Sequence, residues 1–198
     1  MKRIFILLLT CVLLLATVSF AAENPFSDVA QTDYFYEPVL WALENGITTG
    51  KTETLFDPTA PCSRGQVVTF LWRLKGQPQP TTTTTKFTDT PSWKYYYPAI
   101  CWALENGITT GITETIFEPE RSCTQGQLAT FLWRTLGQPE PQSAELVKKH
   151  DTSKFYSKAS AWMEELGAIE AIGGTYYPYG ISSRSQIVTF MYMAAKNS

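Results

Sequence analysis

Apolar residues recur with a helical period in two segments of the chain. In both segments the positions i, i+3, i+4 and i+7 are apolar: Val67, Phe70, Leu71 and Leu74, then Ile187, Phe190, Met191 and Ala194. This spacing predicts two helices, each with one buried stripe. A shorter helix is predicted between Pro38 and Gly46, because proline favours the first turn of a helix and glycine follows its end. Little of the remaining pattern is typical of strands, so we expect a mainly α fold.

The pattern is part of an internal repeat. Residues 26–76 align with residues 87–137 at an offset of 61, and 28 of the 51 positions are identical. A degenerate third copy begins at Trp162 with "WMEELGAIEAIGG" and continues through "SSRSQIVTF" from Ser182. Repeats of this length predict helix-loop-helix units that bury a core only by packing on one another.

The repeats define the expected domain organisation. Segments rich in proline, threonine and glutamine separate the copies and are typical of linkers. We therefore expect a first module over 22–79, a threonine-rich linker over 80–86, a second module over 87–138, a linker over 139–146 and a degenerate third module over 147–198.

The amino terminus has the pattern of a cleaved signal peptide, which we place at residues 1–21. Lys2 and Arg3 precede a long apolar run, and small residues follow it near Ala21. We do not expect a lipid anchor at Cys11, because Thr10 precedes it and the apolar run continues beyond it. The pattern therefore predicts an exported protein.

Composition excludes one class of partner. The chain is 44% hydrophobic and 14% aromatic, which is typical of a packed globular protein. Removal of Lys2 and Arg3 lowers the formal net charge from −2 to about −4. No basic stripe remains, so we expect no nucleic-acid partner. Outside the signal peptide the chain has Cys62, Cys101 and Cys123, an odd number that we interpret as buried free thiols.

A capping-box pattern stands before each apolar stripe, with a hydroxyl residue three positions ahead of a glutamine. The three pairs are Ser63 with Gln66, Thr124 with Gln127, and Ser183 with Gln186. This places Arg64, Gln125 and Arg184 at the first helical position, where the helix dipole is already positive. A cation there is unfavourable unless an anion joins it, so we expect a carboxylate or phosphate held by the guanidinium group and the helix amides.

The alternative is that each arginine pairs with an acid of the protein, such as Asp28 or Glu53, and ties neighbouring modules together. The anion site is complete in at most two of the three modules, because Gln125 carries no charge.

Other chemistries lack residues to perform them. His150 is the one histidine, and we interpret it as a solvated loop residue. No nucleophile pair, metal-ligand spacing or phosphate-binding glycine loop occurs, so we expect no enzyme, no metal and no cofactor. Acidic residues that match between the first two copies repeat with the scaffold, unlike an asymmetric acid and base pair.

Aromatic residues also repeat at fixed spacing. Each of Trp41, Trp102 and Trp162 has an aromatic residue seven positions before it, namely Tyr34, Tyr95 and Phe155. Stacking on sugar rings is one interpretation, but we expect all six to be core residues. Trp72 and Trp133 lie one position past the apolar stripe and are expected to face a neighbouring module or solvent.

These motifs together resemble a known family. The stretch "FSDV…YFYEPVLWALENGITTG…LFDP…CSRGQVVTFLWR" resembles the S-layer homology (SLH) module. Phe-x-Asp, Gly-Ile-x-x-Gly, Phe-x-Pro and a Thr-Arg-Ala-Glu-like element occur in order twice, and the resemblance covers residues 26–195 as three modules. The third copy lacks a clear Phe-x-Asp and Gly-Ile-x-x-Gly, so "SSRSQIVTF" mainly identifies it.

The resemblance implies a pseudo-threefold bundle whose inter-module grooves bind an acidic secondary cell-wall polysaccharide, typically one bearing a pyruvate ketal. In that family the arginine of the Thr-Arg-Ala-Glu element contacts the ligand carboxylate, and a loop glycine lets the backbone approach the sugar. The positions that match these ligand-binding elements are Arg64, Arg184, Gln125, Asp28, Asp89, Gly50 and Gly111. Gln125 departs from the arginine, which leaves at least one groove incomplete.

Two functional hypotheses follow. The first is a non-catalytic protein, secreted to the cell wall or cell surface, that binds a wall polysaccharide as a monomer. The second is an extracellular adaptor built from diverged SLH modules, with a surface protein as its partner.

Overall fold

The computed structural model describes residues 23–197. The expected signal peptide and Cys11 lie outside this range. The described residues form eight helices and no strand, so the prediction of a mainly α fold is confirmed. None of these helices combines the length and the apolar character that crossing a membrane requires.

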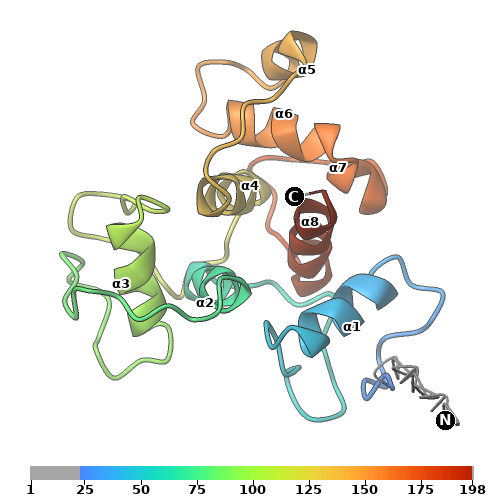
Figure 1. Ribbon diagram of the computed structural model, residues 1–198, viewed down its shortest axis with the longest axis horizontal. Helices are drawn as coiled ribbons and strands as arrows, with labels where there is room; N and C mark the ends of the chain where they lie inside the picture. Colours follow the sequence, from blue (N-terminus) through green and yellow to red (C-terminus); the bar gives the residue numbers. More distant parts are fainter. Residues whose placement is uncertain (1–22, 198) are drawn as a thin grey trace, which may run out of the picture.

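The helices fall into an inner set, an outer set and two short additions (Figure 1). The inner helices are α2 (Arg64–Leu74), α4 (Gln125–Thr135) and α8 (Arg184–Lys196). The outer helices are α1 (Tyr36–Glu44), α3 (Tyr97–Glu105) and α6 (Ser157–Glu165). The two short helices are α5 (Ala144–Lys149), which begins inside the expected second linker, and α7 (Ala168–Ala171).

The capping boxes expected from the sequence are present at all three inner helices. The hydroxyl groups of Ser63, Thr124 and Ser183 each accept a hydrogen bond from the backbone N–H of the glutamine three positions later. Each glutamine side chain accepts one from the cap residue's own N–H in return. Two N–H groups that the helix leaves unpaired are satisfied in this way at every inner helix.

The outer helices pack on inner helices of a different repeat. Helix α3 packs on α2, α6 packs on α4, and α1 packs on α8, so the first repeat contacts the third as closely as the second contacts the first. Figure 1 shows α2, α4 and α8 close together at the centre, with α1, α3 and α6 arranged around them. One core therefore forms from all three repeats.

A ring of backbone hydrogen bonds joins the three repeats just before the inner helices. The N–H of Cys123 donates to Cys62 O at 2.8 Å, that of Ser182 to Cys123 O at 2.9 Å, and that of Cys62 to Ser182 O at 3.2 Å. All three residues are fully buried. The ring closes only when each repeat contributes its strand-like segment.

The cysteines are buried free thiols, as predicted. Burial raises the pKa of Cys62 to about 11 and that of Cys123 to about 12, and it also raises the pKa of Cys101. Thiols with such pKa values stay protonated and pack as small apolar groups.

The prediction for the repeated aromatic residues is half right. Trp102 and Trp162 are buried, and Trp41 packs against the core. The prediction is wrong for the other three, because the exposed fractions of Tyr34, Tyr95 and Phe155 are 46%, 57% and 59%. In each repeat the next aromatic residue takes the inward position, and its ring meets that of the exposed residue edge to face.

The caps predict a measurable stability effect. Replacing Thr124 with alanine leaves the N–H of Gln127 without its acceptor and should lower the free energy of unfolding by about 1 kcal/mol. Urea unfolding followed by circular dichroism measures this. The exposed Thr115 provides a matched control, and an equal loss for T115A would contradict a specific role for the cap.

Candidate functional site

The first residue of each inner helix reaches into the next repeat. Arg64 Nε donates to Phe117 O at 2.9 Å, and Arg184 Nε donates to Phe56 O at 2.8 Å. Gln125 makes the equivalent connection with its Oε1, which accepts from the N–H of Tyr177 at 2.8 Å. These side chains therefore lie at the three contacts between repeats.

Both arginines are enclosed by aromatic rings. The guanidinium carbon of Arg64 lies 4.6 Å from the centre of the Phe117 ring and 5.2 Å from that of Phe131. Arg184 has the same relation to Phe56, at 4.8 Å, and to Phe70, at 5.7 Å. Only 2% of Arg64 and 7% of Arg184 are exposed. Cation–π attraction of this kind is strongest where water is excluded.

No acid neutralises either charge within residues 23–197. None of the ion pairs in this range, at N–O distances up to 4.0 Å, includes Arg64 or Arg184. Burial lowers the pKa of Arg64, and the Nη2 atom of Arg184 is buried without a hydrogen-bond partner. The alternative expected from the sequence was that each arginine pairs with an acid of the protein. It is wrong about the partner, because these arginines tie the repeats together through backbone carbonyls and aromatic rings.

The expectation that helix amides would help to bind an anion is also wrong. The N–H groups of Arg64 and Gly65 donate to Arg121 O and Pro119 O, each at 2.9 Å. The corresponding N–H groups of α4 and α8 donate to carbonyls in the same way. Gly65 serves close packing, since a Cβ there would lie 2.9 Å from the ring of Tyr96. At the starts of the inner helices, these N–H groups are therefore not free to bind a ligand.

The two aspartates of the Phe-x-Asp elements hold the loops that the arginines contact. Asp89 accepts from the N–H groups of Phe117 at 3.0 Å and Glu118 at 2.7 Å. Asp28 makes the same pair of bonds in the first repeat. Both oxygens of each carboxylate are thus engaged, and the bonds fix the carbonyl that receives the next guanidinium group.

The loop glycines are required by their backbone conformation. Gly50 has a φ of 85° and Gly111 a φ of 94°, which favour glycine. A Cβ at either position would also lie 2.5 Å from the ring of Phe26 or Phe87. No other residue lets the loop turn this closely against the Phe-x-Asp phenylalanine.

One pocket brings two of the sequence-predicted residues together. It has a volume of about 260 Å³ and lies where α2, α4 and the loop before α6 meet. Arg64 and Gly111 line it with Gln127, Arg134 and Phe155, and five smaller or apolar residues complete it. Two guanidinium groups and no carboxylate line the pocket, so it is positively charged. We call it the Arg64 pocket.

Arg134 is a site residue that the sequence analysis missed. Its Nη1 donates to Ile108 O at 3.2 Å, and burial lowers its pKa. The signal was present in the repeated "FLWR", which places Arg73 and Arg134 at equivalent positions, whereas Met193 stands there in the third copy. It was missed because the residue follows the apolar stripe and looks like a solvent-facing helix residue.

The three inter-repeat contacts are therefore not equivalent in charge. Arg184 and Arg73 occupy the positions that match Arg64 and Arg134, so two contacts carry a pair of guanidinium groups. At the third contact Gln125 and Met193 take these places.

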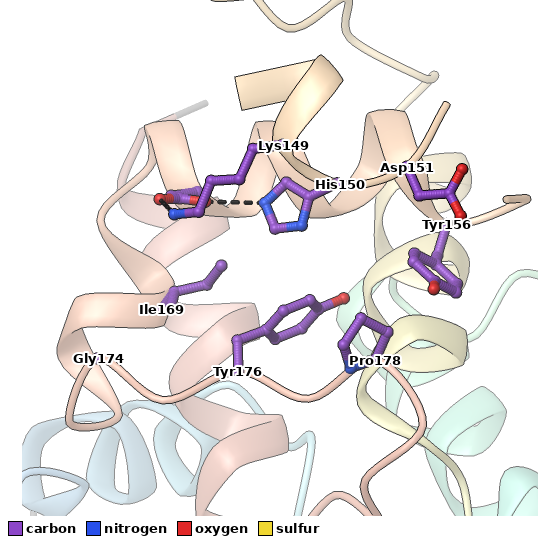
Figure 2. Close-up of a pocket in the computed structure, with 9 residues that line it drawn as sticks. Lys149, His150, Asp151, Tyr156, Ile169, Gly174, Tyr176 and Pro178 are labelled. Carbon is purple, nitrogen blue, oxygen red and sulfur yellow. Dashed lines mark hydrogen bonds and ion pairs between the residues drawn. The ribbon is translucent and has the colours of Figure 1, made fainter. Parts of the chain in front are cut away.

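The prediction for His150 is wrong. Only 8% of its side chain is exposed, and its Nε2 lies 2.8 Å from Glu164 Oε2. Figure 2 shows His150 beside Lys149 and above Tyr176, with a dashed line that marks the contact of its ring. Lys149 Nζ donates to the other oxygen of Glu164 at 2.5 Å, and the ring of His150 meets that of Tyr176 edge to face. Helix α5 carries the "KKH" segment over α6, which the polar sequence did not reveal. The group lines a pocket of about 400 Å³.

The Glu164 cluster, formed by Lys149, His150 and Glu164, replaces an apolar contact of the other repeats. In the outer helices, which align at offsets of 61 and 60, Glu164 stands where the other repeats have Leu43 and Leu104. No three histidine, cysteine or acidic residues within residues 23–197 are grouped as metal ligands. The arrangement is an ion-pair network that secures the start of the third repeat.

Comparison with known proteins identifies two of the three repeats. Residues 25–68 and 86–129 each match the family described as the S-layer homology domain. The chain is thus similar to the SLH domain in two places, and each match covers an outer helix, the Gly50 or Gly111 loop and the first turn of an inner helix.

Three relatives show where similar sequences occur. The chain is 28% identical over 173 residues to an endoglucanase of Bacillus sp. (strain KSM-635), which covers 82% of this chain and 18% of the relative. It is 26% identical over 110 residues to an S-layer protein of Bacillus thuringiensis subsp. finitimus, covering 56% and 14%. It is 27% identical over 124 residues to a cell surface protein of Thermoanaerobacter kivui, covering 61% and 16%. The chain spans less than a fifth of each.

The Asp89 bonds predict a loss of stability on substitution. D89N keeps the size of the side chain but turns an amino group toward one of the two N–H donors. The free energy of unfolding should fall by about 1–3 kcal/mol, which urea titration measures. The exposed E114Q is the control, and equal stability of D89N and the wild type would disprove the anchoring role.

The Glu164 cluster predicts a pH dependence. Burial raises the pKa of Glu164, but the bonds from Lys149 and His150 outweigh it and hold the pKa below its ordinary value of 4.5. A depressed carboxyl pKa stabilises the fold above pH 4.5, and this contribution is lost as the pH falls through the folded-state pKa.

The free energy of unfolding should therefore fall more between pH 7 and pH 3 for the wild type than for E164Q. Urea titrations at the two pH values test this, because the other acids titrate equally in both proteins. The same fall in both proteins would show that Glu164 contributes nothing.

Proposed function

We propose that this protein is a non-catalytic, exported surface protein that binds an acidic polysaccharide of the cell wall in the grooves between its repeats. The observation that carries the proposal is the Arg64 pocket, in which Arg64 and Arg134 face one cavity that no carboxylate lines. The two matches to the SLH domain, together with the S-layer and cell-surface relatives, support a location at the cell surface and a wall polymer as partner.

The chemistry of the pocket favours a carboxylate on a sugar. A buried guanidinium group without an acid is costly, and a ligand carboxylate would supply both the charge and the hydrogen-bond acceptors. Gln127 and the backbone at Gly111 offer neutral hydrogen-bonding groups beside the two arginines, as sugar hydroxyls require. A pyruvate ketal, which places a carboxylate on a pyranose ring, has the required combination.

The third repeat is a degenerate SLH module in this proposal. Its support is structural: Ser183 caps α8 as Ser63 and Thr124 cap the other inner helices, and Arg184 repeats the contact of Arg64. The buried Nη2 of Arg184, which has no hydrogen-bond partner, supports a second binding position for the same ligand. The contact with Gln125 holds the repeats together without binding an acid.

The endoglucanase relative does not change the proposed function. The match covers 18% of that protein, which leaves most of its length unrelated to this chain. The acids that repeat between copies stand at equivalent scaffold positions, and Asp28 and Asp89 are engaged by backbone N–H groups. The shared part is therefore proposed to be a wall-binding part.

The test removes the positive charge of Arg64 and Arg184 by substitutions that preserve the fold. R64Q and R184Q copy the residue that the chain itself uses at position 125, where a glutamine side chain spans the same contact. Each substitution should weaken co-sedimentation with purified sacculi about tenfold, because hydrogen bonds to charged groups contribute about 1.5–3 kcal/mol. The double variant should not bind. Binding should also disappear when the non-peptidoglycan polymer is removed chemically from the sacculi.

The exposed Arg121 provides the control, because its side chain pairs with Glu118 outside the pocket. R121Q should sediment as the wild type does, and circular dichroism should show equal helix content in all variants. Unchanged binding of the double variant to intact sacculi would refute the proposal and favour a surface protein as the partner.

A further inference from the structure

The Arg64 pocket is too small to enclose a polysaccharide. Its volume of about 260 Å³ lies below the range of about 300–1,000 Å³ that is typical of sites for whole small ligands. A polymer that places one acidic unit beside Arg64 must leave the pocket, and the next units must lie on the neighbouring surface. The residues beside the pocket therefore show what the next units of the polymer would contact.

A second pocket begins where the Arg64 pocket ends. Phe155 lines both cavities and forms the wall between them. The second cavity has a volume of about 340 Å³ and lies between α4 and α6. Lys154, Lys158 and Trp133 line it together with Phe155 and three smaller side chains, and no acid does. We call it the lysine pocket.

The walls of the lysine pocket suit a charged sugar. Phe155 is 59% exposed, and Trp133 uses its Nε1 to donate to Pro139 O at 2.8 Å. Trp133 is only 9% exposed, so the exposed ring of Phe155 offers the apolar face on which a pyranose ring can stack. Lys154 and Lys158 reach solvent with 43% and 51% of their side chains exposed, and each lies near an acid outside the pocket. They can turn toward an anion at little cost, since exposed ion pairs are weak.

At the three contacts between repeats, the charge at the position of Lys154 varies together with the charge at the position of Arg64. The outer helices align at offsets of 61 and 60, so Lys94 and Asp33 are the equivalents of Lys154. Lys94 belongs to the second repeat, in which Tyr95 is the equivalent of Phe155, and Asp33 belongs to the first repeat, in which Tyr34 is the equivalent.

The cavity at the equivalent place in the first repeat has the opposite charge. It lies between α1 and α8 and is lined by Glu37 and Glu44, and Glu37 is the equivalent of Lys158. This acidic cavity is lined by Tyr192 of α8, the helix whose Gln186 contacts Gln125. The other two repeats keep a lysine, Lys94 or Lys154, at the position of Asp33. This joint change in two separate places is expected if one acidic ligand contacts both.

We propose that the Arg64 pocket and the lysine pocket are consecutive subsites for one acidic polysaccharide chain, which crosses Phe155 between them. The inference rests on the proposed function and adds a second contact, with the following sugar unit, to it. The lysine pocket then selects for a polymer whose negative charge repeats along the chain.

The test exchanges the lysines for their acidic counterparts in the first repeat. K154D/K158E reproduces Asp33 and Glu37 at the equivalent positions. The probes are size-fractionated fragments of a pyruvylated wall polysaccharide, one with a single acidic repeating unit and one with three or more. Isothermal titration calorimetry at about 0.15 M salt limits long-range effects of charge to about 8 Å. The control K148D/K196E makes the same charge change at exposed lysines elsewhere.

In the wild type the long fragment should bind about tenfold more tightly than the single unit. K154D/K158E should remove this gain and leave the affinity for the single unit unchanged, whereas R64Q should lose both. F155A should also weaken the long fragment. The control variant should retain the wild-type difference between the two fragments.

Three results would overturn the inference. If K154D/K158E binds the long fragment as the wild type does while R64Q loses it, the second subsite is wrong and the proposed function stands. If K154D/K158E weakens both fragments equally, the lysines act only through their general field. If the wild type binds neither fragment, the proposed function fails together with the inference.

Discussion

The structure depends on backbone hydrogen bonds that each repeat makes only with another repeat. The N–H groups that open an inner helix donate to carbonyls of the next repeat's loop, and the ring through Cys62, Cys123 and Ser182 closes the set. Buried N–H groups must be paired, so a repeat that folded alone would leave these donors unsatisfied. Helix packing also requires the other repeats, because each outer helix covers an inner helix of a different repeat. Folding of one repeat is therefore conditional on the other two.

This constraint also explains why no carboxylate of the described residues pairs with Arg64 or Arg184. The carboxylate of Asp89 is close to the loop that Arg64 contacts, but it accepts from two backbone N–H groups and is held away from the guanidinium group. Arg64 then relies on a carbonyl and two aromatic rings, which position it without cancelling its charge. The scaffold uses its acids for loop geometry and leaves cations in the groove. The positive charge of the Arg64 pocket follows from how the loop is built.

Features that depend on residues nearby in the chain could be predicted from the sequence. Features that depend on contacts with a distant element could not. The caps at Ser63, Thr124 and Ser183 and the apolar stripes are local patterns, and they appear as expected. His150 was misplaced because its burial comes from α6, fourteen residues later, through Glu164. Among the candidate site residues, the position of Arg64 on its helix was correct. Its neutral surroundings and the contribution of Arg134 required the fold, because both depend on a different repeat.

The contact between α1 and α8 limits how this architecture can grow. The first outer helix covers the last inner helix, so the circle is complete with three units and has no open end. A fourth repeat added at either terminus would find no uncovered inner helix to pack on and no free position in the central ring. Duplication of a single repeat therefore cannot add a groove. A single contact between repeats can change its charge, as at Gln125, while its repeat remains necessary for the closed arrangement.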